Sequence, residues 1–459
     1  MLRTLLRASA SHLVALLVAS TLVVSTSSAA LAQQMRLLRD AEIENTIRTF
    51  VTPVLQAAGL NPNTVTIYLV EDPRLNAFAT TNQRMFLNSG FLTATDGPGE
   101  VIGVLAHEAG HIAGGHLSRM RDEVAGAQMT SLAAALLGIG AALLTGDPRA
   151  ASAGSVIGGD IALKNFLQYS QSQEQAADQA AITYLRGAHY NPEGLVEFMR
   201  KLDGQRVLNA IRQDPYLSTH PMTDSRIRFL EREVAQSPYK DKPWPPEWLE
   251  MFERMKAKLI GYLEAPAAVA RAYPASDDSL PARYARAIST YRNSSFADAL
   301  VQVEALIAER PQDPFFQELK GQILLESGKV AEAEGAYGKA VELLPGEPQL
   351  RLQLALVQIQ TNSPATDQAA LENLTKVLAR EPGDASAWRL SAIANGRLGN
   401  EGMAAMSLAE YNFARGEWRD ARGQAEKAMT LLTEHSTGWL RAADIAAVAE
   451  RNQDRADKR

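Results

Sequence analysis

The chain of 459 residues contains no cysteine. Disulfide bonds, thiolate nucleophiles and cysteine metal ligands are therefore excluded, and any bound metal ion must be held by His, Asp or Glu. Basic residues are not in excess, because 46 Lys and Arg face 52 Asp and Glu, which leaves a net charge of −6. This balance argues against a general nucleic-acid-binding protein. The content of 46% hydrophobic and 21% charged residues is that of an ordinary globular protein, long enough for two or three domains.

Histidine is scarce, and its distribution is uneven. Of seven histidines in the chain, three lie between residues 107 and 116. His107 and His111 are four positions apart in a His-Glu-Ala-Gly-His sequence, so on a helix both imidazoles can bind one zinc ion. Glu108 lies one position further round, where its carboxylate can act as general base on a water molecule. The alternative is an ordinary helix with two histidines and no metal.

A catalytic zinc site needs a third protein ligand and an open position for water, and two residues compete for this role. His116 follows His111 by five positions, about 140° round a helix, so it points away unless the chain turns. Glu174 is the stronger candidate because it lies on a separate predicted helix, residues 169–186. Asp178 would share its helix face and could bind the second nitrogen of a ligand histidine. The alternative for both carboxylates is a solvated helix face.

The first 32 residues predict a cleavable signal peptide. Arg3 and Arg7 form a basic start, residues 13–24 an apolar core, and an Ala-x-Ala cleavage motif ends at Ala32. The core is too short to span a bilayer comfortably. We therefore expect an exported bacterial protein, with an uncleaved N-terminal anchor as the alternative.

The next part of the chain predicts a helix over residues 37–58 and strands over residues 65–70, 76–79 and 84–87, followed by the helix with the two histidines. This order is common in zinc peptidases, in which an edge strand holds the substrate by backbone pairing. We expect residues 84–87 to be that strand, and a purely structural strand is the alternative.

Residues 124–146 contain no charged residue and are rich in Ala, Leu and Gly. Their number would permit a transmembrane helix. Since Ala and Gly are weakly hydrophobic and the segment interrupts the predicted active-site region, we favour two packed helices or a flap that contacts a membrane surface.

The C-terminal part is repetitive. One unit matches the tetratricopeptide pattern of 34 residues at Gly321, Gly328, Ala333, Tyr337, Ala340 and Pro345. Weaker copies precede and follow it, and about three extra residues are expected near 362–367. The predicted organisation is a signal peptide (1–32), a peptidase domain (33–265), a linker (266–282) and a repeat domain (283–450). The predicted fold class is α+β of the zincin type with a small sheet, followed by an all-α solenoid with a concave face for a partner.

Several spaced motifs, taken together, resemble the M48 zinc metallopeptidases. They are His107–His111 with the HExxH pattern, Glu174–Asp178 with the later ExxAD pattern, Asn76–Ala79, Asn88–Leu92, His220-Pro221 and Arg226. The resemblance covers most of residues 37–235 and, with the signal peptide and the repeats, is closest to a periplasmic branch of that family.

The resemblance implies one Zn²⁺ per chain, with His107, His111 and Glu174 as ligands and Glu108 as general base and acid. It implies that Asp178 contacts a zinc ligand and not the zinc ion itself. His220 and Arg226 would stabilise the oxyanion, or His220 would bind the zinc as a fourth ligand in a resting state. For these two residues the alternative is an ordinary turn and a surface ion pair.

The resemblance also implies a function. The chain would be a periplasmic zinc metalloendopeptidase of a Gram-negative bacterium that cleaves misfolded or misassembled outer-membrane proteins. Its repeats would recruit substrate or the outer-membrane assembly machinery, and nucleic acid would not be a partner. The alternatives are a chaperone-like scaffold with little proteolytic activity and a membrane-embedded peptidase that residues 124–146 anchor.

Overall fold

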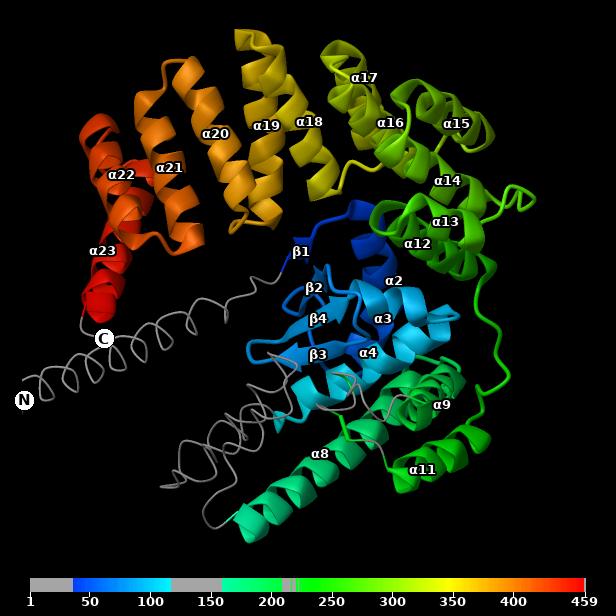
Figure 1. Ribbon diagram of the computed structural model, residues 1–459. Coiled ribbons are helices and arrows are strands. Elements are labelled where there is room, and N and C mark those ends of the chain that lie inside the picture. The colour runs from blue at the N-terminus through cyan, green and yellow to red at the C-terminus, as the bar shows by residue number, and fades with distance from the viewer. Residues whose placement is uncertain (1–35, 117–158, 209–215, 217–219, 222, 458–459) are drawn as a thin grey trace, which may run out of the picture. The chain divides into compact units, whose positions relative to one another are not determined.

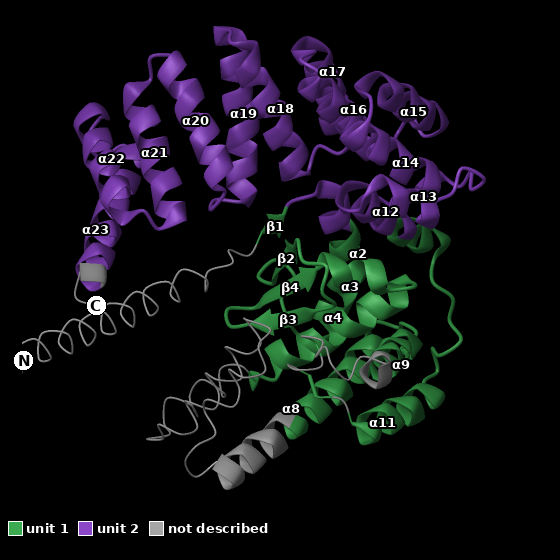
Figure 2. Ribbon diagram, in the orientation of Figure 1, with its two compact units in different colours: residues 1–38, 46–252 green, residues 39–45, 253–459 purple. Residues whose placement is uncertain are grey.

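The computed structural model describes residues 36–116, 159–208, 216, 220–221 and 223–457 (Figure 1). The predicted signal peptide and the uncharged segment 124–146 lie outside these residues. Within the described part of the chain, no helix is both long and apolar enough to cross a membrane. The chain divides into two compact units, shown in two colours in Figure 2. Unit 1 comprises residues 1–38 and 46–252, and unit 2 comprises residues 39–45 and 253–459.

Unit 1 contains a mixed sheet of four described strands in the order β1-β2-β4-β3. The strands are β1 (Leu37–Leu38), β2 (Thr66–Val70), β3 (Ala77–Thr80) and β4 (Arg84–Asn88). β2 runs parallel to β4, and β3 pairs with β4 as an antiparallel hairpin. The turn of this hairpin contains Asn82 and Gln83, both with positive φ, a conformation that Asn adopts more readily than most residues.

The expectation that residues 84–87 form the edge strand is wrong. β4 pairs with β2 on one side and with β3 on the other, so both of its edges are occupied. The parallel pairing with β2 is a non-local contact that periodicity does not reveal. β3 is one of the two outer strands of the described sheet, and β1 is the other. Since Asn88 donates its backbone N–H to Asn76, the register directs the backbone groups of Ala77 and Ala79 outward.

Seven helices of the described residues contribute to unit 1. They are α2 (Ala41–Ala57), α3 (Ser89–Ala94), α4 (Pro98–Ala113), α8 (Gly159–Gly187), α9 (Glu193–Leu208), α11 (Asp224–Ala235) and the first part of α12 (Pro246–Leu263). Helix α4 packs against α8, α9 and β3. Glycines permit the close helix contacts, because a Cβ on Gly103 would lie 2.8 Å from the backbone of Leu195 and one on Gly110 would lie 3.0 Å from the carbonyl oxygen of Ala177.

Unit 2 is an all-helical solenoid of stacked helix pairs, as the repeat pattern predicts. After the later part of α12 and α13 (Pro266–Ala272), the pairs are α14 (Leu280–Asn293) with α15 (Phe296–Glu309), α16 (Pro314–Glu326) with α17 (Val330–Leu343), α18 (Pro348–Thr361) with α19 (Pro364–Arg380), α20 (Ala385–Arg397) with α21 (Glu401–Arg415), and α22 (Trp418–Leu431) with α23 (Thr437–Asp457). A Cβ on Gly321 would lie 2.8 Å from the ring of Tyr337, so glycine lets α16 and α17 pack closely. Helix α19 has 17 residues where α15 and α17 have 14 each, which places the three extra residues at its start, as expected.

The boundary between the units lies within α12, earlier in the chain than the expected end of the peptidase domain at residue 265. The segment 266–282, expected to be a linker, contains α13 and the start of α14. Residues 39–45, at the start of α2, belong to unit 2. There, the hydroxyl of Tyr284 donates to Glu42 at 2.8 Å.

Candidate metal centre

The predicted histidines lie side by side on α4. A flanking Gly97 and a proline at the first helical position set the start of this helix, and every residue from Pro98 to His111 is buried. The helical repeat brings Nε2 of His107 within 3.1 Å of Nε2 of His111. Two imidazole nitrogens therefore converge on one point inside unit 1.

Helix α8 brings Glu174 to the same point. Because Gly110 on α4 has no side chain, the backbone of α8 at Ala177 can approach α4 closely. Oε2 of Glu174 lies 3.3 Å from Nε2 of His107, and Oε1 of Glu174 lies 3.3 Å from Nε2 of His111. The structure thus brings together the three residues expected as ligands.

His220 is the fourth member of this group. Its Nδ1 lies 3.1 Å from a carboxylate oxygen of Glu174 and 3.4 Å from Nε2 of His107. The buried ring of Tyr216 stacks on the His220 ring at 4.5 Å between centroids. Sequence reasoning did not identify Tyr216, which carries no motif and reaches the site only through the tertiary fold.

Glu108 lies between the histidines and the sheet. Its Oε2 accepts a 2.7 Å hydrogen bond from the backbone N–H of Ala79 on β3. Its Oε1 is buried and makes no hydrogen bond within the described part of the chain, although Nε2 of His220 lies 3.4 Å away. One carboxylate oxygen is therefore held by the strand, and the other is directed toward the converging histidines.

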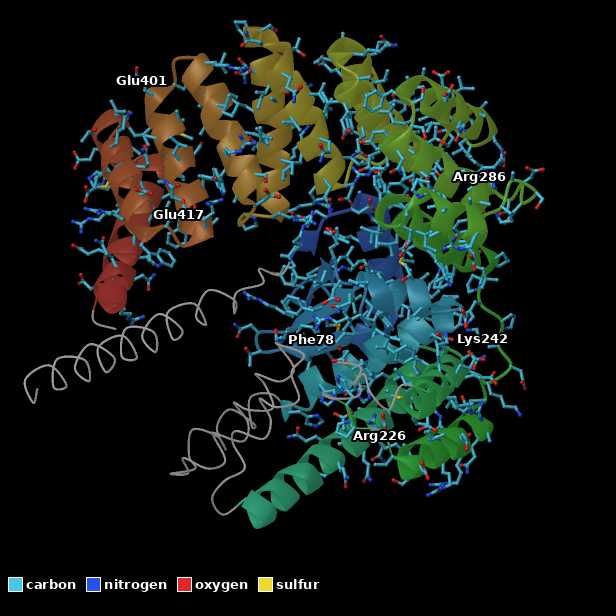
Figure 3. All side chains as sticks on the ribbon, viewed as in Figure 1. Phe78, Arg226, Lys242, Arg286, Glu401 and Glu417 are labelled. Atoms are coloured by element: carbon cyan, nitrogen blue, oxygen red, sulfur yellow. The ribbon has the colours of Figure 1, made fainter. Side chains whose placement is uncertain are left out.

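A buried ion pair supports the ligand side chains from α11. The guanidinium of Arg226 donates to both oxygens of Asp178 at 2.7 and 2.9 Å and lies 3.0 Å from Glu174. Arg226 is labelled in Figure 3. It also donates to the carbonyl oxygen of Pro221 at 2.9 Å. Asp178 in turn lies 3.0 Å from Nδ1 of His107. Every nitrogen of the Arg226 side chain is therefore engaged by these groups.

These contacts shift the pKa values of the buried groups. Burial alone would lower the pKa of His107, but Asp178 and Glu174 raise it to about 9. Burial and the neighbouring His107 lower the pKa of His111. Burial would raise the pKa of Glu174, yet the histidines around it hold its pKa well below the usual range. Before a metal binds, the site thus favours an ionised Glu174, a neutral His111 and a protonated His107.

The donor set fits a metal ion. One ligand atom from each of His107, His111, Glu174 and His220 lies within 4.8 Å of the others, and all four residues are buried. Imidazole nitrogens with one carboxylate are typical ligands of a catalytic divalent metal. The Oε1 of Glu108 faces this group and accepts no hydrogen bond from the residues that the structure describes, which suits a water molecule beside the metal.

His116 lies next to the site because the chain turns after the end of helix α4. Helix α4 ends at Ala113, and Gly115 has a φ of 62°. The chain turns there, and Nδ1 of His116 lies 3.0 Å from Nδ1 of His111. His116 contacts Nδ1 of His111, whereas His107 and Glu174 contact its Nε2. The two consecutive glycines before His116 are the sequence signal for this turn.

Comparison with known proteins agrees with this geometry. Residues 38–234 match peptidase family M48. The β-barrel assembly-enhancing protease of Yersinia pestis is 28% identical over 80% of this chain and 74% of its own length. The protein of that name from Escherichia coli K12 is 26% identical over 81% of this chain and 74% of its own length. Metalloprotease LoiP of Escherichia coli K12 is 28% identical over 40% of this chain and 69% of its own length.

Proposed function

On the premise that the chain carries a domain of peptidase family M48 and is a metalloprotease, we propose that it is a zinc endopeptidase of the periplasm. It cleaves misfolded or misassembled outer-membrane proteins in a Gram-negative bacterium. The similarity to two β-barrel assembly-enhancing proteases over about 80% of the chain supports this substrate class. The predicted signal peptide supports the location.

One observation carries the proposal: four buried candidate ligands converge beside the Glu108 carboxylate, whose Oε1 accepts no hydrogen bond among the described residues. His107, His111 and Glu174 would hold the zinc, which when bound would supply a water molecule of lowered pKa and polarise the scissile carbonyl. Oε1 of Glu108 accepts the proton of that water, and the same oxygen delivers it to the leaving amine. The hydrogen bond from Ala79 keeps Oε2 away from this proton transfer.

The outer edge of β3 binds the substrate. Ala77 and Ala79 direct their backbone groups outward, and the N–H of Ala79 already contacts Glu108. An extended peptide that pairs with this edge would run directly past the general base. This binding mode explains how a protease can accept unfolded chains of varied sequence, because main-chain groups provide the contacts.

His220 holds the resting enzyme inactive. Its ring is among the converging ligands, 3.1 Å from Glu174, and Tyr216 stacks on it. A fourth protein ligand occupies the position that a catalytic site leaves for water. Withdrawal of the His220 side chain would free that position for water, and the site would then be catalytic.

Arg226 is a positioning residue in this proposal rather than a group that stabilises the oxyanion. Its side chain is 99% inaccessible to solvent, and its guanidinium is already bound to Asp178, Glu174 and Pro221. Its nitrogen atoms are thus directed at these buried protein groups and not at a substrate carbonyl. It keeps the carboxylates of Glu174 and Asp178 ionised and correctly oriented toward the histidines.

The stacked helix pairs of unit 2 recruit a substrate or the outer-membrane assembly machinery. Such solenoids expose an extended surface for protein segments. The alternative function is a chaperone-like scaffold with little proteolytic activity, which the repeats favour. The placement of Glu108 favours the enzyme, because a structural metal site has no use for a base beside the metal.

The decisive experiment measures zinc content and casein cleavage for the mature protein and for Glu108→Gln. The enzyme proposal predicts one zinc per chain in both proteins, with cleavage lost in the variant. Equal cleavage by both proteins at a rate above background, or by His220→Ala with and without Glu108→Gln, would exclude the mechanism. The scaffold function would be established if the wild type binds zinc and suppresses aggregation while neither the wild type nor the His220→Ala variant cleaves casein.

The resting state is tested with His220→Ala, which should raise cleavage while zinc remains bound. His435→Ala is the matched control, because the His435 side chain is 75% exposed and lies in unit 2. A fall in cleavage for His220→Ala alone would show that His220 assists catalysis and does not inhibit it.

A further inference from the structure

His116 contacts a proposed zinc ligand without belonging to the converging group. It is 95% inaccessible to solvent, and its ring stands at 82° to the ring of His111 with the centroids 5.0 Å apart. Their Nδ1 atoms are separated by 3.0 Å, which is a hydrogen-bond distance. One of the two nitrogens must therefore donate a proton and the other accept it.

The position of His111 decides which nitrogen donates. Its Nε2 faces Glu174 at 3.3 Å and His107 at 3.1 Å, so Nε2 is the nitrogen that faces the proposed zinc. A zinc-binding nitrogen needs its lone pair, which leaves the proton of a neutral imidazole on Nδ1. His111 is therefore the donor, and Nδ1 of His116 is the acceptor.

The chain around His116 is built to allow this contact. Helix α4 stops before Gly114, and Gly115 has a φ of 62°, which returns the chain toward the helix. A Cβ on Gly114 would lie 2.6 Å from Nε2 of His116. Glycine at position 114 therefore leaves the space that the imidazole of His116 occupies.

The other ligand histidine of α4 also has a polar neighbour at Nδ1. Nδ1 of His107 lies 3.0 Å from a carboxylate oxygen of Asp178, without hydrogen-bond geometry. Each histidine of the pair thus directs Nε2 toward the converging group and has a second polar group beside Nδ1. That group is a carboxylate for His107 and an imidazole for His111.

We propose that His116 is a positioning residue for the zinc site. It accepts the Nδ1 proton of His111, which fixes the ring orientation and keeps the lone pair on Nε2, while Gly114 provides room for its ring. The proposal rests on the proposed function, because it requires that His111 bind zinc. It concerns metal affinity and not the chemical step.

The test compares His116→Asn with His116→Leu. The two side chains have similar size, but only Asn has an acceptor oxygen near the position of Nδ1. Zinc affinity is measured on the mature full-length protein by competition with a chelator, and thermal unfolding of the metal-free protein reports on packing. Loss of the partner of a metal ligand typically weakens metal binding by about 10–100-fold. We expect that loss for His116→Leu and at least partial recovery for His116→Asn.

Wild-type zinc affinity in His116→Leu would overturn the proposal. Equal losses of affinity and thermal stability in both variants would also overturn it, since they would indicate packing alone. Gly114→Ala is a second variant, which keeps the imidazole of His116 but displaces it. Introduced into the wild-type sequence it should weaken zinc binding, whereas introduced into His116→Leu it should have no further effect on zinc affinity. If Gly114→Ala folds and binds zinc normally, the proposal fails.

His111→Ala separates this inference from the proposed function. If His111→Ala binds zinc as tightly as the wild type, the proposed ligand set itself is wrong. If His111→Ala loses zinc while His116→Leu retains it fully, only the role of His116 is refuted.

Discussion

The backbone N–H of Ala79 donates a 2.7 Å hydrogen bond to Oε2 of Glu108. This contact joins the outer strand of the sheet to the proposed general base on α4. Because the strand holds one oxygen, the orientation of the other depends on the length of the Glu108 side chain as well as on its charge.

Glu108→Asp tests this geometry. The shorter carboxylate cannot reach both Ala79 and the water position, and displacement of a reacting group by about 1 Å can lower the rate about 100-fold. We expect kcat for a casein-derived peptide to fall by about that factor, with zinc content unchanged. A variant with near-normal kcat would show that the hydrogen bond does not position the base.

Removal of Arg226 should destabilise unit 1. Arg226→Ala leaves the buried carboxylates of Asp178 and Glu174 without their cation, and loss of one partner of a buried ion pair typically costs about 3–5 kcal/mol. We expect that decrease in the free energy of unfolding of the metal-free protein, measured with denaturant. Arg232→Ala, at an exposed position of the same helix, should change it by less than about 0.5 kcal/mol.

An oxyanion role for Arg226 would give a different result. In that case Arg226→Ala would lower kcat strongly while leaving the unfolding free energy and the zinc content near those of the wild type. Arg226→Lys keeps the charge but lacks the two-point contact with Asp178, so an intermediate stability is expected if the residue positions the carboxylates.

Zinc affinity should rise with pH up to about 9. In the metal-free protein, Asp178 and Glu174 raise the pKa of His107 to about 9 against the effect of burial, so below that pH a proton must leave when zinc binds. The pKa of His111 is lowered and that of Glu174 is well below its usual range, so neither adds a second proton near neutral pH. We expect the logarithm of the association constant to increase by about one per pH unit between pH 7 and 9.

Asp178→Asn provides the comparison for this pH dependence. Without the Asp178 carboxylate, the pKa of His107 falls, so the curve should level off at a lower pH. An unchanged curve in this variant would mean that His107 does not carry the proton that zinc displaces.

Unit 2 should lose stability as the pH rises through 7. Nζ of Lys258 lies 2.8 Å from Asp40, 3.3 Å from Glu42 and 3.4 Å from Glu318. Burial and the two neighbouring carboxylates raise the pKa of Glu318 to about 7, against the opposing effect of Lys258. A raised carboxyl pKa contributes stability that is fully present below the pKa of the unfolded chain, near 4.5, and is lost as the pH rises through 7.

Glu318→Gln should therefore reduce the dependence of the melting temperature on pH between pH 5 and 7.5. Relative to the wild type, the variant should be stabilised more at pH 7.5 than at pH 5. Glu304→Gln is the control, because that side chain is 57% exposed and pairs with Lys320 at the surface. Parallel melting curves for Glu318→Gln and the wild type across this range would contradict the prediction.

Local sequence patterns predicted much of the peptidase unit. The spacing of His107 and His111 places both on one helix face, which the structure confirms. The strands β2, β3 and β4 lie within one residue of their predicted positions. The helix predicted over residues 37–58 begins only at Ala41, because residues 37–38 pair with β2 as strand β1, and α8 begins at Gly159, well before the predicted start at residue 169. The choice of Glu174 over His116 as the residue that faces both histidines also agrees with the structure. The edge strand was predicted wrongly because strand order depends on pairing between distant segments.

By itself, the sequence determined the class of site, the helix that carries it and the repeat solenoid, because these depend on contacts between residues a few positions apart or on a fixed period. Only the tertiary structure decided that β3 and not β4 is an outer strand, that Arg226 binds Asp178 and Glu174, and that His116 returns to His111. The first two depend on packing between segments far apart in the chain. The third depends on a glycine turn whose direction the residue spacing alone does not specify.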